Sequence, residues 1–182
     1  MSVEPEKSLL LMTGSTREGS VNTAVLKTAR TTLPHHWTAL AYSGLTQLPH
    51  FNPDVERSVP PPPVRNLRAA IRASDAILFC TPEYAGAMPG ALKNLLEWTI
   101  GDTVMYGKPV GWINPSTAPQ RAAGTYASLK TVLSYTGATI VDDACLNIPV
   151  NRALIGETGT DEDLGVQERI RAGVLALTSC TH

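Results

Sequence analysis

The sequence predicts an α/β fold in which one open parallel sheet is covered by helices on both faces. Leu9–Met12 and Ser74–Cys80 contain unbroken apolar runs of the kind expected for strands buried on both faces. Each run is followed by a loop and then by a helical spacing of apolar residues, so the same strand–loop–helix unit occurs twice. Strands and helices continue to alternate along the chain, which favours right-handed β–α–β connections.

The remaining elements follow this alternation. Further strands are expected at Trp37–Tyr42, Pro109–Asn114 and Thr139–Val141. Helices are expected after Ser20, around Val64, Leu67 and Ile71, after Pro89, over Arg121–Tyr135 with a stop at Gly137, and around Val166, Ile170, Val174 and Leu177.

Two details of this assignment concern the middle of the chain. Arg65, Arg68 and Arg72 share the short helix around Val64, and we expect all three to face solvent. Ser43–Pro63 has no periodicity and contains several prolines, so we predict a long loop that overhangs a functional site.

Length and composition favour one compact domain over residues 1–182. The chain has 43% hydrophobic residues and a net charge of −1 with no dense basic cluster, so nucleic acid and anionic membranes are poor partners. It has no apolar run of the roughly 20 residues that a membrane span needs and no signal-peptide pattern, so a cytoplasmic location is expected. The Cys and His residues have no metal-ligand spacing, and no metal site is expected.

The loop after the first strand is rich in hydroxyls and glycine and leads into a helix. A loop of this kind directs backbone N–H groups at one point, where an anion is stabilised. Arg17 adds a planar fork of donors that suits two phosphate oxygens. The alternative is that Ser20 only caps the helix and Arg17 is a solvated loop residue.

Two more loops are expected at the same edge of the sheet. Thr81–Asn94 follows the second buried strand, and Pro115–Gln120 follows the strand at Pro109–Asn114. Ligands of open parallel sheets bind where the carboxyl ends of the strands meet, so the three loops predict one shared site.

Two motifs carry a family resemblance. GSTREGSVN at Gly14–Asn22 and PEYAGAMPGALKNLLEW at Pro82–Trp98 resemble the paired motifs of the NADPH-dependent FMN reductases, in the flavodoxin-like superfamily. The resemblance implies a five-stranded sheet of order 2-1-3-4-5, bound FMN, and NADPH or NADH as the reductant. It covers most of the chain, from about Leu9 to Leu177.

The resemblance also implies roles for individual residues. Residues of the first loop would hold the FMN phosphate, namely Ser15, Arg17, Ser20, Val21 and Asn22. Pro82, Glu83 and Tyr84 would lie along the isoalloxazine ring, and Ser116 would complete the ring pocket. The chain departs from the family pattern at Ala85, where Asn is usual, and in the loop STAPQRAAG, where the family has more glycine and arginine.

The implied chemistry is carried by the flavin, which takes a hydride from the nicotinamide and passes electrons to a second substrate. No side chain is expected to act as a catalytic acid, nucleophile or metal ligand, and Glu83 also suits a structural role as an acceptor for backbone N–H groups. Quinones, azo and nitro compounds, metal oxyanions and free flavin all remain open as acceptors. A flavodoxin-type electron carrier is the first alternative, and a phosphatase is disfavoured because Gly14–Asn22 holds no Cys or Asp nucleophile.

The helix after Pro89 generates an expectation about assembly. Leu92, Leu95 and Leu96 form its inward stripe, which leaves Trp98, Met105 and Tyr106 for another surface. The resembling family commonly forms dimers through this region. We therefore expect a homodimer, or a homotetramer of paired dimers, with Leu96–Tyr106 near the two-fold axis.

Overall fold

The computed structural model describes residues 6–181 except 18, 119 and 121. It contains a five-stranded, all-parallel sheet in the order β2-β1-β3-β4-β5, which confirms the predicted topology. The strands are β1 (Lys7–Thr13), β2 (Trp37–Ala41), β3 (Ala76–Cys80), β4 (Pro109–Asn114) and β5 (Thr139–Asn147). The fifth strand runs six residues beyond its predicted end at Val141, and this extension bears on the site described below.

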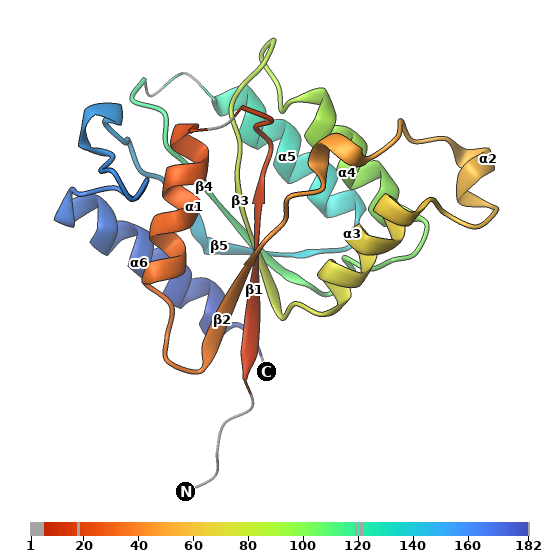
Figure 1. The fold of residues 1–182 in the computed structure, drawn as a ribbon, viewed down its shortest axis with the longest axis horizontal. Helices are drawn as coiled ribbons and strands as arrows, with labels where there is room; N and C mark the ends of the chain where they lie inside the picture. The colour runs from red at the N-terminus through yellow and green to blue at the C-terminus, as the bar shows by residue number, and fades with distance from the viewer. Residues whose placement is uncertain (1–5, 18, 119, 121, 182) are drawn as a thin grey trace, which may run out of the picture.

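Helices cover both faces of the sheet (Figure 1). One face carries α1 (Val21–Thr31) and α6 (Leu164–Ser179), and the other carries α3 (Pro62–Arg72), α4 (Gly90–Ile100) and α5 (Ala123–Tyr135). Short helices occur at η1 (Leu45–Gln47), α2 (Pro53–Glu56) and η2 (Arg152–Leu154). The predicted helix Arg121–Tyr135 begins at Ala123, and Arg121 lies outside the described residues. Gly137 adopts a positive φ of 76° just beyond α5, as expected for a helix stop.

Alternation along the central strands divides the core in two. Leu10 and Met12 of β1 pack toward α3, α4 and α5, whereas Leu9 and Leu11 pack toward α1 and α6. Since β1 is hydrogen-bonded to a strand on each side and covered by helices on each face, its apolar run has no polar face. None of the described helices is long and apolar enough to cross a membrane.

The expectation that all three arginines of α3 face solvent is wrong for Arg68. Its side chain is only 6% exposed and bonds to Glu56 Oε2 at 2.6 Å. Its Nε also donates to the backbone oxygen of Trp98 at 2.9 Å. The reason lies in the segment from Ser43 to Pro63, because Glu56 of its helix α2 brings a carboxylate to the guanidinium on α3.

The same segment overturns the expectation that Trp98 lies on a free surface. Trp98 is fully buried, with its indole N–H donating to the Pro49 oxygen at 2.9 Å and its ring meeting Phe51 edge-on at 5.0 Å. Met105 is buried as well, whereas Ile100, which by spacing shares the inward stripe, is 47% exposed. The segment therefore packs on α3 and α4, and α2 projects from the side of the molecule in Figure 1.

Replacing Arg68 should be costly. Arg68→Met removes the guanidinium and leaves the Glu56 carboxylate and the Trp98 carbonyl without their donor, so unfolding free energy should fall by about 3 kcal/mol. Arg65→Met on the same helix is the control, because Arg65 is exposed and should change stability by less than about 0.5 kcal/mol. Denaturant unfolding of both variants measures their unfolding free energies. If Arg68→Met is as stable as Arg65→Met, the buried pair contributes nothing to stability.

Candidate functional site

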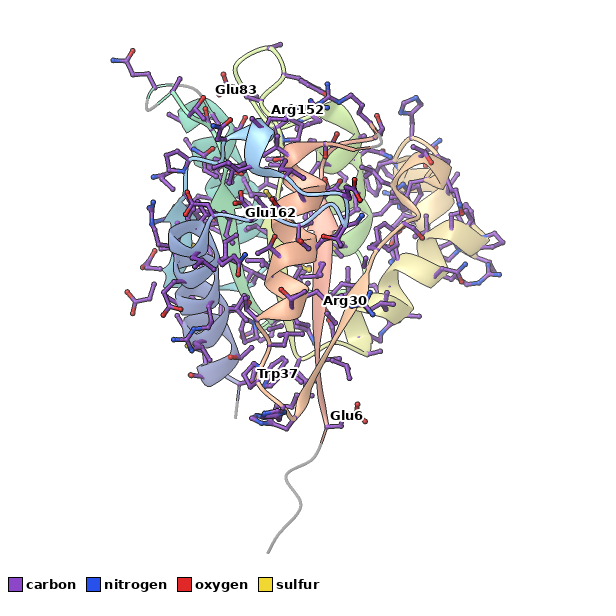
Figure 2. All side chains as sticks on the ribbon, turned by 60° about the vertical axis from the view of Figure 1, so that its left-hand side comes forward. Glu6, Arg30, Trp37, Glu83, Arg152 and Glu162 are labelled. Atoms are coloured by element: carbon purple, nitrogen blue, oxygen red, sulfur yellow. The ribbon has the colours of Figure 1, made fainter. Side chains whose placement is uncertain are left out.

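A cleft of about 490 Å³ opens at the carboxyl edge of the sheet. The start of α1 and the loops after β3 and β4 line it, and the segment after β5 forms a further wall that the sequence did not predict. The loop between β1 and α1 was expected to share this site, but none of its described residues lines the cleft. Its described lining residues are Val21, Asn22, Thr81, Pro82, Glu83, Asn114, Pro115, Ser116, Thr117, Ala122, Val150, Asn151 and Arg152. Figure 2 shows Glu83 and Arg152 at this same edge.

The N-terminus of α1 presents donors to the cleft. Ser20 caps the helix by accepting from the Thr23 N–H at 3.1 Å. The N–H groups of Val21 and Asn22 lie in the first turn, have no acceptor among the described residues, and belong to residues that line the cleft. These free donors and the positive end of the helix dipole fit a phosphate group.

Cys80 at the end of β3 orients Asn22. Its thiol donates to Asn22 Oδ1 at 3.3 Å, which leaves the Asn22 Nδ2 hydrogens without a described acceptor. Burial raises the pKa of the Cys80 thiol well above its usual range, so the group stays protonated and is no nucleophile.

The loop after β3 is joined to the start of α5. Glu83 Oε2 accepts the N–H of Thr125 at 3.4 Å, which supplies an acceptor at a helix whose N-cap, Ala122, has no capping side chain. The backbones approach so closely that a Cβ at Gly124 would lie 2.2 Å from the Gly86 oxygen. The structural role foreseen for Glu83 is therefore present.

A two-residue turn ends the β3 loop. Tyr84 and Ala87 exchange backbone hydrogen bonds of 3.0 and 3.2 Å, and the residues between them, Ala85 and Gly86, have φ of 52° and 76°. Such turns favour Asn or Gly at the first central position because other residues are strained there. The departure from the family pattern at Ala85 therefore places an alanine in a left-handed conformation.

Hydrogen bonds from neighbouring strands order the loop after β4. Asn114 donates to Asn147 Oδ1 of β5 at 2.9 Å and accepts the Ser116 N–H at 3.0 Å. The Ser116 hydroxyl donates to the Ala118 oxygen at 3.2 Å. Tyr126 of α5 donates to the Ile113 oxygen at 2.7 Å and accepts the Thr81 N–H at 3.4 Å, which joins the ends of β3 and β4.

The wall after β5 was missed because the strand was predicted too short. Its extension to Asn147 carries the chain to the cleft edge, where the Val150 N–H bonds to the Pro115 oxygen at 3.1 Å. Arg152 then lines the cleft with no acceptor among the described residues. The available signal was the alternation of Ala144, Leu146 and Ile148, which a local bulge beside Gly111 separates from Val141.

The predicted site residues are divided among three places. Val21, Asn22, Pro82, Glu83 and Ser116 meet in the cleft. Ser15 and Arg17 line a second cavity on the other side of the β1 loop. Ser20 lines neither cavity and caps α1, and Tyr84 lines neither and is 53% exposed.

The fold defines a flavodoxin-like protein with a cleft at the carboxyl edge of its sheet, beside the start of α1. The sequence matches the family model described as NADPH-dependent FMN reductase over residues 8–152, and the chain belongs to that family. It is therefore an oxidoreductase that works with FMN and NAD(P)H.

Individual relatives agree with this assignment. The chain is 33% identical over 129 residues to an NAD(P)H-dependent FMN reductase of Pseudomonas aeruginosa, covering 70% of this chain and 69% of that protein. It is 30% identical over 161 residues to a quinone reductase of Pseudomonas putida, covering 87% and 83%. Among solved structures, FerB, a flavoenzyme NAD(P)H:(acceptor) oxidoreductase from Paracoccus denitrificans, aligns with a TM-score of 0.83 at 27% identity over 97% of this chain and 100% of that one.

Ala85→Asn should stabilise the protein. Asn adopts the left-handed conformation at lower cost than Ala, so we expect a gain of about 0.5–1 kcal/mol in unfolding free energy. Ala87→Asn is the control, because Ala87 has no positive φ and should gain nothing. Thermal unfolding of the two variants makes the comparison, and a loss of stability in Ala85→Asn would contradict the strain argument.

Tyr126→Phe should remove about 1 kcal/mol of stability at neutral pH, because the Ile113 carbonyl loses its donor. Burial, more than the nearby Cys80, raises the pKa of Tyr126 in the folded state. As the pH rises above about 10, a tyrosine in the unfolded chain loses its proton first, so the parent protein should lose stability. Tyr126→Phe has no hydroxyl to titrate at this position and does not lose this stability. The difference in unfolding free energy between the parent and the variant should therefore shrink above pH 10 in denaturant titrations. A constant difference would contradict the assignment.

Proposed function

We propose that this protein transfers a hydride from NAD(P)H to FMN held in the cleft, and then passes electrons to a small-molecule acceptor such as a quinone. The observation that carries the proposal is the pair of N–H groups at Val21 and Asn22, which have no acceptor among the described residues, in a cleft lined by the start of α1 and the loops after β3 and β4. Bound FMN supplies the redox chemistry, because N5 of its ring accepts a hydride and the reduced ring donates electrons.

The chain's own residues bind and orient in this proposal. The start of α1, with Ser15, Arg17, Ser20, Val21 and Asn22, holds the FMN phosphate. Pro82, Glu83, Tyr84 and Ser116 lie beside the ring. Hydrogen bonds already fix the β3 and β4 loops through Glu83, Asn114 and Tyr126, so little ordering is needed when the cofactor binds.

A quinone is the first acceptor to test, since relatives of this chain carry the name quinone reductase. Azo and nitro compounds, metal oxyanions and free flavin are the other acceptor classes.

The alternative function is a flavodoxin-type electron carrier acting in the cytoplasm. Steady oxidation of NAD(P)H by the purified protein with a quinone supports the enzyme, and reduction limited to a single turnover supports the carrier.

The purified protein should contain or take up FMN rather than FAD. The sequence has no G-x-G-x-x-G turn for a pyrophosphate, and the cleft begins at one helix N-terminus. An absorption spectrum of the extracted flavin, followed by chromatography against both standards, tests this. Stoichiometric FAD, or no flavin after reconstitution, would contradict it.

Arg17→Ala should weaken FMN binding by roughly 1.5–3 kcal/mol, the range for a hydrogen bond to a charged partner. In the structure Arg17 is exposed and lines the second cavity, so contact with the phosphate requires the side chain to turn over the loop. Quenching of FMN fluorescence measures the affinity. An unchanged dissociation constant would leave Arg17 as a solvated loop residue with respect to FMN.

We still propose a homodimer or homotetramer, but with fewer of the expected residues free to form its interface. Leu96, Trp98 and Met105 are buried within one protomer, so the exposed large hydrophobic side chains of Leu96–Tyr106 are those of Ile100 and Tyr106, at 47% and 79%. Light scattering coupled to size exclusion should give twice or four times the 19.4 kDa chain mass. A monomer at micromolar concentration with full NADPH oxidation would remove the proposal.

A further inference from the structure

A second cavity of about 440 Å³ lies on the other side of the β1 loop from the cleft. We call it the groove. Its walls are the exposed flank of α1 and the end of the edge strand β2, and Leu11, Leu26 and Ala41 make part of its surface apolar. Thr16 and Thr23 add hydroxyls at the end nearest the β1 loop.

The charged side chains of the groove are all positive. Arg17 comes from the loop, and Lys27 and Arg30 come from α1, where a spacing of three residues places them on one side of the helix. No Asp or Glu is among its described lining residues; Glu18 lies outside the described part of the chain. Figure 2 shows Arg30 on the part of α1 beside β2, further along the helix from the edge that carries Glu83 and Arg152.

Within the described part of the chain these three cations have no hydrogen-bond or ion-pair partner, which is also true of Arg152. Among the described residues, every other Lys or Arg side chain except Arg152 bonds to a carboxylate or a backbone oxygen. Ion pairs hold Arg57, Arg68, Arg72, Lys93, Lys130 and Arg171, and backbone oxygens accept from Lys7, Arg65, Lys108 and Arg169. Three unpaired cations around one cavity favour an anionic ligand with more than one charge.

The β1 loop connects the groove to the cleft. Ser15, Arg17 and Gly19 line the groove, and Val21 and Asn22, which follow directly, line the cleft. A ligand that reaches from the cleft across this loop arrives at Lys27 and Arg30. The apolar wall suits a flat base, and the cations suit a phosphate.

We propose that the groove binds the 2′-phosphorylated adenosine end of NADPH while the nicotinamide lies in the cleft. The proposal rests on the function proposed above and adds a site that distinguishes NADPH from NADH, since only NADPH carries the 2′-phosphate. Lys27 and Arg30 are the specificity-determining residues. Arg17, at the loop end of the groove, is assigned to the FMN phosphate in the function proposed above and does not distinguish NADPH from NADH.

The test uses the flavin-loaded protein and a double variant, Lys27→Gln with Arg30→Gln. The matched control is Arg65→Gln with Lys130→Gln, which removes two exposed helical cations from the opposite face of the sheet, outside both cavities. Calorimetric titration with 2′,5′-ADP and with 5′-AMP requires no redox chemistry. The parent and the control should bind 2′,5′-ADP about tenfold more tightly than 5′-AMP, and the double variant should lose this preference.

Kinetics provide the second readout. In the double variant the KM for NADPH should rise about tenfold with kcat unchanged, while the KM for NADH and the affinity for FMN stay at the values of the control. A parent protein without preference for 2′,5′-ADP would overturn the proposal. So would a double variant that binds 2′,5′-ADP like the control, or one whose KM rises equally for both nucleotides. If the protein fails to oxidise NAD(P)H, the proposed function falls, while the titration still decides whether the groove recognises the 2′-phosphate.

Discussion

The pairing of β1 with β3 is the constraint on which the site depends. Both strands are buried on both faces, so a slip of one residue would exchange the side chains that pack into the two halves of the core. The register runs from Leu9 opposite Ala76 to Thr13 opposite Cys80, so the strands end level. Gly14 then packs against Thr81 so closely that a Cβ would lie 1.9 Å from its hydroxyl. The loops after β1 and β3 must therefore leave the sheet side by side.

The helix after the β1 loop serves two cavities. Val21 and Asn22 of its first turn line the cleft, and their N–H groups have no acceptor in the part of the chain that the structure describes. Its exposed flank carries Lys27 and Arg30 along the groove. Both features favour negative charge, the first through the helix dipole and the second through side-chain charge. One helix can thus contribute to holding a cofactor phosphate and a reductant phosphate at separate points, which fits a family defined by FMN and NADPH.

The loops of the cleft are held by residues whose roles are visible only in three dimensions. Glu83 was expected beside the ring or as an acceptor for backbone N–H groups, and the structure shows it accepting from α5. Tyr126, which the sequence marked only as an inward residue of a helix, links β3 to β4 through its hydroxyl. Helical spacing identifies the buried face of α5 but says nothing about which backbone groups a buried hydroxyl will meet.

The sequence by itself determined the five strands and their parallel arrangement, because unbroken apolar strands alternating with helical spacing are local patterns that a sheet covered on both faces satisfies. Its motifs also placed Val21, Asn22, Pro82, Glu83 and Ser116, which the structure brings together in one cleft. Only the tertiary structure decided the burial of Arg68 and Trp98, the wall at Arg152 and the groove beside Lys27. Each of these depends on contacts between segments distant in the chain, such as Glu56 with Arg68 or Pro49 with Trp98, and the residues that supply them have no local periodicity that would reveal their partners.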